Sequence, residues 1–169
     1  MRKFKLTLLV AFLFVTGSVW AQTTNYQVYA LYVVNIAKYS SWPNVQGELR
    51  IAVFGKSRVY DELMKQNGKS VNGSTLRVYQ AEQVDNLAEA HILYVADGKS
   101  GTLEDLVKAT TGKATMIIAE REGLHKKGAG FSFVIMENSS LRFDMNHTEL
   151  EKRSIKVSKN LTTLANSSI

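Results

Sequence analysis

Short apolar segments of strand length alternate with helix-like segments along most of the chain, and this alternation constrains the fold more than any other feature. Residues 92–96 (ILYVA) are the clearest strand, because strands buried on both faces of a parallel sheet are almost continuously apolar. Further strands are predicted at residues 49–54, 75–79 and 115–119. Helices are expected between them, for example at residues 58–66, where Ser57 is a natural N-cap. This order predicts a mostly parallel sheet.

The alternation of strands and helices stops in the last third of the chain, where two strands follow each other directly. Residues 131–136 and 141–145 are predicted as two antiparallel strands joined by a hairpin turn at residues 137–140 (ENSS). Asn146 then caps a helix, with Glu149 in the capping-box position, and a final helix runs to about residue 165. We therefore expect a single three-layer α/β domain, in which a mostly parallel sheet of about six strands ends in an antiparallel hairpin and carries helices on both faces.

An unusually apolar helix is predicted at residues 26–40, ahead of the first strand. A helix that is apolar nearly all round is buried on most sides or meets another molecule. Because aromatic side chains are enriched in interface cores, this segment and the Trp-Pro pair that closes it supply the candidate interaction residues, which are Tyr29, Tyr32, Tyr39, Trp42 and Pro43. Packing of these side chains against the sheet is the alternative, and the two roles can occupy opposite sides of one helix.

The first 21 residues are typical of a cleavable secretion signal. Arg2, Lys3 and Lys5 form a positive start, residues 6–20 carry no charge, and a cut after Ala21 fits the small-residue rule. The alternative is an uncleaved membrane anchor, but the apolar run is shorter than the roughly 20 residues that a span requires. We therefore expect an exported protein whose mature chain, residues 22–169, forms the α/β domain.

The composition of the mature chain excludes several classes of function. Removal of the signal leaves 18 basic residues against 15 acidic ones, a net charge of +3, and no dense basic stripe, so we expect no nucleic-acid partner. The chain contains no cysteine. Thiol redox chemistry and thiolate metal sites are therefore excluded.

No motif predicts catalysis, a cofactor or a metal. Residues 98–100 (GKS) end like a phosphate-binding loop, but the earlier glycine that such a loop requires falls at Leu93, inside a strand. The three histidines, His91, His125 and His147, lack the spacing of a local metal motif. Glu120, Glu122 and Asp144 can in principle approach one another, but solvated surface carboxylates are the expectation. The basic loop at residues 121–130 suits an acidic partner or lipid headgroups, and equally a solvated connection.

Two stretches together resemble a known family. The first is residues 35–43 (NIAKYSSWP), which end the apolar helix, and the second is residues 141–146 (LRFDMN) followed by residues 158–165 (SKNLTTLA). In order and spacing they are similar to the YfiR-like family of exported bacterial proteins, over nearly all of the mature chain.

The resemblance implies a periplasmic α/β domain without a catalytic site. Better-known members are negative regulators that bind the periplasmic sensor portion of an inner-membrane diguanylate cyclase, which lowers cyclic-di-GMP synthesis and affects biofilm formation, and they tend to dimerise. Members often carry cysteines, one of them where Ala90 stands here, so redox control does not carry over. The implied partner is thus a membrane-bound signalling protein of the cyclase or kinase type, with a possible homodimer.

Two other classes of function stay open. An open α/β sheet offers a crevice at the carboxyl ends of its strands, here near Gly55 and residues 97–101, so a periplasmic small-molecule binding module serving transport or sensing is the runner-up. An enzyme of an unrecognised type is the third.

Overall fold

The computed structural model describes residues 26–43, 45–87 and 89–169. The predicted signal peptide, residues 1–21, lies outside this part of the chain. Among the residues described, no helix is long and apolar enough to cross a membrane.

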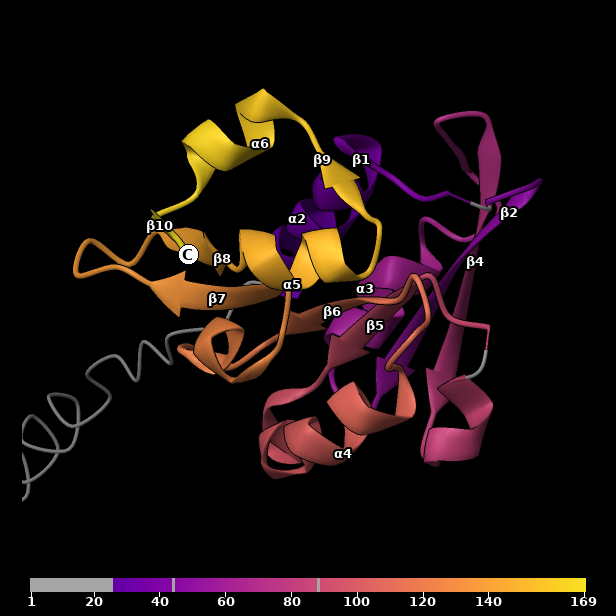
Figure 1. The fold of residues 1–169 in the computed structure, drawn as a ribbon, viewed down its shortest axis with the longest axis horizontal. Coiled ribbons are helices and arrows are strands. Elements are labelled where there is room, and N and C mark those ends of the chain that lie inside the picture. Colours follow the sequence, from indigo (N-terminus) through magenta and orange to yellow (C-terminus); the bar gives the residue numbers. More distant parts are fainter. Residues whose placement is uncertain (1–25, 44, 88) are drawn as a thin grey trace, which may run out of the picture.

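Helices and strands alternate as predicted (Figure 1). The strands are β1 (Ser40–Ser41), β2 (Glu48–Phe54), β3 (Ser70–Val71), β4 (Ser74–Ala81), β5 (Ile92–Val95), β6 (Met116–Ala119), β7 (Phe131–Ile135), β8 (Leu141–Met145), β9 (Lys156–Val157) and β10 (Ser167–Ser168). The α-helices are α2 (Tyr26–Lys38), α3 (Val59–Met64), α4 (Leu103–Ala109), α5 (His147–Lys152) and α6 (Lys159–Leu164), and the 3₁₀ helices are η1 (Val84–Leu87), η2 (Asp97–Thr102) and η3 (Leu124–Lys127).

An eight-stranded sheet with the order β10-β8-β7-β6-β5-β2-β4-β3 forms the centre of the domain. Strands β4, β2, β5, β6 and β7 are parallel, and β7 and β8 form the predicted antiparallel hairpin. The mostly parallel α/β fold is therefore confirmed. The sheet exceeds the expected six strands because β3 and β10, each only two residues long, extend its two edges. A strand of two residues is too short to show the alternation of apolar and polar residues from which strands are predicted.

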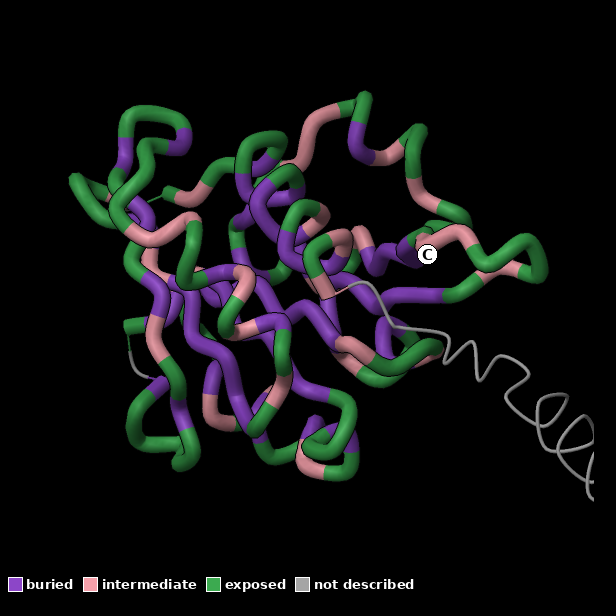
Figure 2. The backbone as a smooth tube through the Cα atoms, turned by 180° about the vertical axis from the view of Figure 1, so that it is seen from behind, coloured by how far each residue is buried: buried purple, intermediate pink, exposed green. Residues whose placement is uncertain are grey.

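Two hydrophobic cores lie on opposite faces of the sheet, so that the domain has three layers. Because neighbouring strand residues point to opposite faces, Ile92 and Tyr94 enter one core and Leu93 and Val95 the other. Helices α2, α3, α5 and α6 contribute to the first core, and η1, α4 and η3 to the second. Figure 2 shows the buried backbone following the central strands, with exposed residues at the turns around them.

Helix α2 is shorter than predicted, because the chain leaves the helix at Lys38 and Ser40–Ser41 form β1, antiparallel to β9. The Asn72 side chain fixes this end: its amide nitrogen donates to the carbonyl of Lys38 at 2.9 Å and lies 3.4 Å from those of Ala37 and Ser40. Carbonyls at a helix end have no partner within the helix and need one elsewhere. A residue distant in the sequence supplies it, which is why the sequence pattern did not show where the helix ends.

The last segment of the chain is anchored by a buried arginine. Arg153, directly after α5, donates from Nη1 to the Thr110 carbonyl and hydroxyl, both at 3.0 Å, and to the Thr115 carbonyl at 3.2 Å. Burial lowers the pKa of this guanidinium from its ordinary value, and Glu149 partly offsets the effect. A buried cation is thus held by neutral oxygen atoms that tie the C-terminal segment to the loop between α4 and β6.

We expect Arg153→Met to lower the free energy of unfolding by about 2–4 kcal/mol, because the Thr110 hydroxyl and the Thr115 carbonyl lose a buried donor. Lys152→Met is the matched control: among the described residues the polar contact of the Lys152 side chain is an exposed ion pair with Glu149, so that its loss costs less than about 1 kcal/mol. Urea denaturation of the two variants measures the difference. Equal stability of both would show that Arg153 does not anchor the segment.

Candidate functional site

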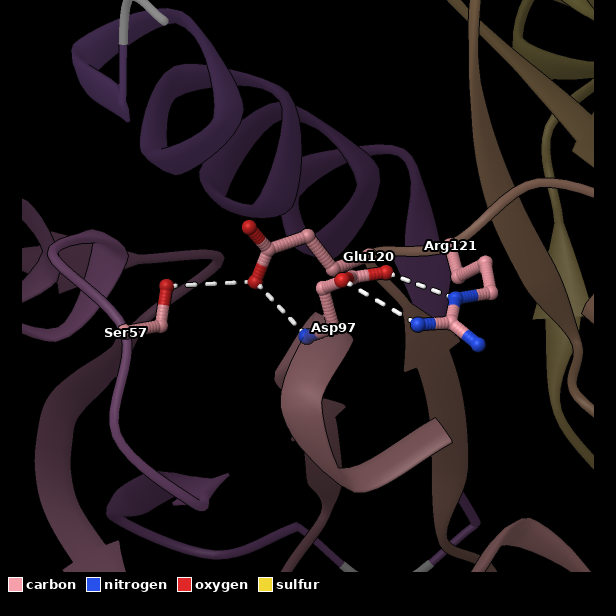
Figure 3. A network of polar contacts seen from close by, with 4 residues as sticks. All are labelled: Ser57, Asp97, Glu120 and Arg121. Atoms are coloured by element: carbon pink, nitrogen blue, oxygen red, sulfur yellow. Dashed lines mark hydrogen bonds and ion pairs between the residues drawn. The ribbon is translucent and has the colours of Figure 1, made fainter. Parts of the chain in front are cut away.

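Polar side chains gather where three neighbouring strands of the sheet end. Ser57 follows β2, Asp97 follows β5, and Glu120 and Arg121 follow β6 (Figure 3). The chain leaves β2 through Gly55, whose φ of 89° is a backbone conformation that favours glycine. Because β4 and β5 lie on opposite sides of β2, this is the point where the strand order reverses. Ligands of open α/β sheets bind at such switch points.

Glu120 holds the three loops together. Its Oε2 accepts a hydrogen bond from Ser57 Oγ at 3.1 Å and another from the Asp97 backbone N–H at 3.2 Å. Arg121 binds Asp97 with both Nε, at 2.8 Å, and Nη2, at 3.2 Å, which lowers the pKa of the Asp97 carboxyl. In the described part of the chain Glu120 forms no ion pair, so its carboxylate is balanced by hydrogen bonds alone.

Two tyrosines of the core, Tyr29 and Tyr94, are influenced by the charge of Glu120. Burial, and next the charge of Glu120, raises the pKa of Tyr94 well above its ordinary value. Burial also raises the pKa of Tyr29, with Glu120 the next cause. The Tyr94 hydroxyl is buried and close enough to respond to Glu120, but the geometry does not complete a hydrogen bond between them or to any other described residue. The Glu120 carboxylate therefore influences two tyrosines of the core beside it.

An open cleft of about 520 Å³ adjoins the network through Ser57. It carries both signs of charge, and the Arg58 guanidinium lies 6.0 Å from the centre of the Tyr26 ring. The lining residues are Tyr26, Lys56, Ser57, Arg58, Tyr60, Asp61, Gln80 and Glu82. Mixed charge beside an aromatic ring suits a small polar ligand better than an apolar one.

The sequence predicted a crevice near Gly55 and residues 97–101, and the polar network lies at these loops, but the sequence did not predict the role of Glu120 in it. Glu120 was expected to be a solvated surface carboxylate, although it directly follows a predicted buried strand. That position, shared with Asp97, was the available signal. Ser57 plays a different role from the predicted one: Arg58 occupies the N-cap position of α3, while Ser57 Oγ accepts from the Val59 N–H at 3.2 Å and donates to Glu120.

Two of the five candidate interaction residues pack inwards. Tyr29 is only 7% exposed and meets the Phe133 ring edge-on at a centroid distance of 5.0 Å. Tyr32 is half-buried between Phe133 and Phe143, and its hydroxyl donates to the Leu141 carbonyl at 2.9 Å. The apolar character of α2 is thus explained largely by its packing on the sheet.

The other three candidates, Tyr39, Trp42 and Pro43, lie at the carboxyl end of α2. Tyr39 is 46% exposed and Pro43 is exposed, whereas Trp42 is half-buried with its indole N–H donating to the His91 carbonyl at 3.1 Å. The Tyr39 carbonyl accepts from the Ser158 N–H at 2.8 Å. We call these three residues the Tyr39–Pro43 surface; its backbone is fixed to the C-terminal segment.

The domain belongs to the class of open, mostly parallel α/β sheets, with a network of polar side chains where the strand order reverses. Residues 26–166 match the model of the YfiR/HmsC-like family, and the chain belongs to this family. The family is generally regulatory rather than catalytic.

Two solved structures share the fold at low sequence identity. One, described as the ABC domain in complex with L-Trp from Streptococcus pneumonia, has a TM-score of 0.60 and 13% identity over 83% of this chain and 60% of that one. The other, a conserved domain protein from Vibrio cholerae O1 biovar eltor, has a TM-score of 0.59 and 14% identity over 86% of this chain and 60% of that one. This chain therefore spans less than two thirds of either neighbour.

Replacement of Glu120 tests its role in joining the loops. We expect Glu120→Ala to lower the free energy of unfolding by about 1–3 kcal/mol, because Ser57 and the Asp97 N–H both lose their acceptor. Glu122→Ala, an exposed carboxylate two residues on, is the matched control and is expected to leave stability unchanged. Thermal unfolding of both variants measures the difference in stability. An equal loss of stability in the two variants would contradict the role of Glu120 in joining the loops.

His91, whose carbonyl accepts the hydrogen bond from the Trp42 indole, makes the free energy of unfolding depend on pH. His91 Nδ1 accepts from the Arg50 N–H at 3.0 Å, which requires the neutral ring, and burial followed by the Arg50 charge lowers the pKa of His91. The unfolded chain then binds the proton more readily, so this stabilisation is complete above the unfolded histidine pKa of about 6.5 and is lost as pH falls towards the folded pKa. We expect His91→Gln to show a smaller loss of stability than the unmodified protein between neutral and mildly acidic pH in urea titrations. Burial also lowers the pKa of His125. The His91→Gln variant therefore still loses the part of its stability that depends on a neutral His125.

Proposed function

We propose that this protein is a periplasmic regulator without catalytic activity, which binds the sensor portion of an inner-membrane signalling protein of the cyclase or kinase type and represses it. In this proposal residues 1–21 are removed on export, by cleavage after Ala21, and the mature domain acts alone or as a homodimer. The regulatory character of the family supports it.

The observation that carries the proposal is the Tyr39–Pro43 surface. In this surface an exposed tyrosine and an exposed proline lie beside a half-buried tryptophan. Tyrosine and tryptophan are among the residue types that dominate binding energy at interfaces. The hydrogen bonds from Trp42 to the His91 carbonyl and from Ser158 to the Tyr39 carbonyl hold this surface in one conformation. A preformed surface loses little conformational freedom on binding.

Repression follows from occupancy. A regulator that binds the inactive state of its partner more tightly than the active one shifts the population towards the inactive state, by no more than the difference between the two affinities. No covalent step is required, so the absence of a recognisable catalytic motif in the sequence is compatible with this role.

Cross-linking followed by capture from membranes identifies the partner. We expect the mature protein to recover an integral membrane protein with a periplasmic domain, and the variant Tyr39→Ala/Pro43→Ala to bind that domain at least about 10-fold more weakly. Ile135→Ala, which removes an apolar side chain that is 60% exposed on β7, is the control and is expected to bind normally. Recovery of no membrane protein, or equal loss in both variants, contradicts the proposal.

The cleft beside Ser57 favours a second candidate, a periplasmic small-molecule binding module for transport or sensing. The polar network around Glu120 that adjoins this cleft supports it, as does the structural neighbour that was solved with L-Trp. A thermal-shift screen with polar periplasmic metabolites separates the two: a large stabilisation that Glu120→Ala abolishes, without a membrane partner, favours this candidate.

A further inference from the structure

The sequence contains two Asn-Gly pairs, Asn67-Gly68 and Asn72-Gly73. In such a pair the backbone nitrogen of the glycine can attack the side-chain amide carbon of the asparagine, because glycine has no side chain that hinders the approach. The reaction is deamidation, which converts the asparagine into aspartate or isoaspartate. The structure places the two pairs in different surroundings, so we do not expect them to react alike in the folded protein.

Asn72 and Gly73 form the two-residue turn between β3 and β4. Their φ angles, 51° and 81°, are both positive, as in the type I′ turns that join antiparallel strands. Both residues are exposed, and within the described part of the chain the Gly73 N–H donates to no acceptor. The nitrogen that has to attack is therefore not engaged in a hydrogen bond.

The Asn67-Gly68 pair, in contrast, is held against the edge of the sheet. The Gly68 N–H donates to the Leu76 carbonyl at 2.8 Å, and Asn67 Oδ1 accepts from the Val78 N–H, also at 2.8 Å. Leu76 and Val78 both belong to β4. Attack at Asn67 therefore requires that two hydrogen bonds to β4 open first, one of them made by the attacking nitrogen.

The Asn72 side chain also holds the turn against the end of α2. Its Nδ2 donates to the Lys38 carbonyl at 2.9 Å and lies 3.4 Å from the carbonyl oxygens of Ala37 and Ser40. Deamidation replaces this donor by a carboxylate, which accepts hydrogen bonds but does not donate them. The new negative charge lies among carbonyl oxygens at the carboxyl end of a helix, where a negative charge is unfavourable.

We propose that Asn72 is a site of spontaneous deamidation in the folded protein, and that the modification releases the β3–β4 turn from the carboxyl end of α2. The Gly73 nitrogen forms a bond to Asn72 Cγ and closes a succinimide ring. The Cγ–Nδ2 bond breaks, and Nδ2 leaves as ammonia with the proton of the Gly73 N–H. Water then opens the ring at either carbonyl, which gives aspartate or isoaspartate. The proposal is independent of the function proposed above.

Mass spectrometry of the ageing protein tests the site. We would incubate the exported protein at mildly alkaline pH, where the attacking nitrogen loses its proton more readily, and incubate a second sample in urea. Trypsin cuts after Lys69, so that Asn67 and Asn72 fall into separate peptides. A sample digested before incubation corrects for deamidation during the digestion itself.

In urea we expect similar rates at the two asparagines, because each is followed by glycine and the folded surroundings are lost. In the folded protein we expect Asn72 to react at least about fivefold faster than Asn67, because one more hydrogen bond has to open at Asn67. The Asn67-Gly68 pair thus serves as an internal control in the same sample.

Asn72→Asp reproduces the aspartate product and tests the release. The Tyr39 N–H, which donates to the Asn35 carbonyl at 3.0 Å at the end of α2, is expected to exchange with deuterium about 10-fold faster in this variant. Asn138→Asp is the matched control, because it adds the same charge in the turn between β7 and β8 and keeps the acceptor that Ser140 uses. It is expected to leave the exchange of the Tyr39 N–H unchanged.

Three results would overturn the proposal. The first is a rate at Asn67 in the folded protein that equals or exceeds the rate at Asn72. The second is an unmodified Asn72 after the time in which the sample in urea has reacted completely. The third is an exchange rate of the Tyr39 N–H in Asn72→Asp no higher than that in Asn138→Asp. The first two are measured without any substitution, so a folding defect cannot produce them.

Discussion

The burial of α2 against one face of the sheet is the interaction on which the rest of the structure depends. Tyr29 and Tyr32 meet Phe133 edge-on, and Tyr32 also meets Phe143. These contacts join the first element of the domain to the hairpin of β7 and β8, more than 90 residues later in the sequence. Edge-to-face pairs add stabilisation beyond the apolar area they bury. With α2 in place, its carboxyl end becomes a fixed point to which later segments attach.

The two stretches that carry the family resemblance meet at this fixed point. Residues 35–43 contain β1, and β9 pairs with β1 directly before residues 158–165 begin. Ser158 has two roles, because its N–H donates to the Tyr39 carbonyl and its Oγ accepts from the Leu161 N–H at the start of α6. The spacing of the two stretches therefore reflects a contact in space. This contact fixes the backbone of the Tyr39–Pro43 surface.

The sequence predicted those features in which a residue's neighbours in the chain decide its structure. The apolar run at residues 92–96 and the Asn146 cap are examples, and both are found: β5 is fully buried, and Asn146 Oδ1 accepts from the Glu149 N–H at 2.9 Å. What it missed depends on distant partners. The pairing of Ser40 with Val157 and the contact of Glu120 with Ser57 bring together residues far apart in the chain, and no local pattern encodes them. Tyr29 and Tyr39 illustrate the same limit, since two tyrosines of one predicted helix end in opposite environments.

The way Arg153 holds the last segment has a consequence for the kind of signal this protein can receive. A guanidinium stays protonated at any pH a cell compartment reaches, and its acceptors here are oxygen atoms that do not titrate in that range. Where a disulfide would make the attachment of this segment sensitive to thiols, the chain has no cysteine to form one. The attachment therefore gives the same shape under oxidising and reducing conditions. Neither thiol oxidation nor deprotonation of the guanidinium can therefore be the signal that releases this segment.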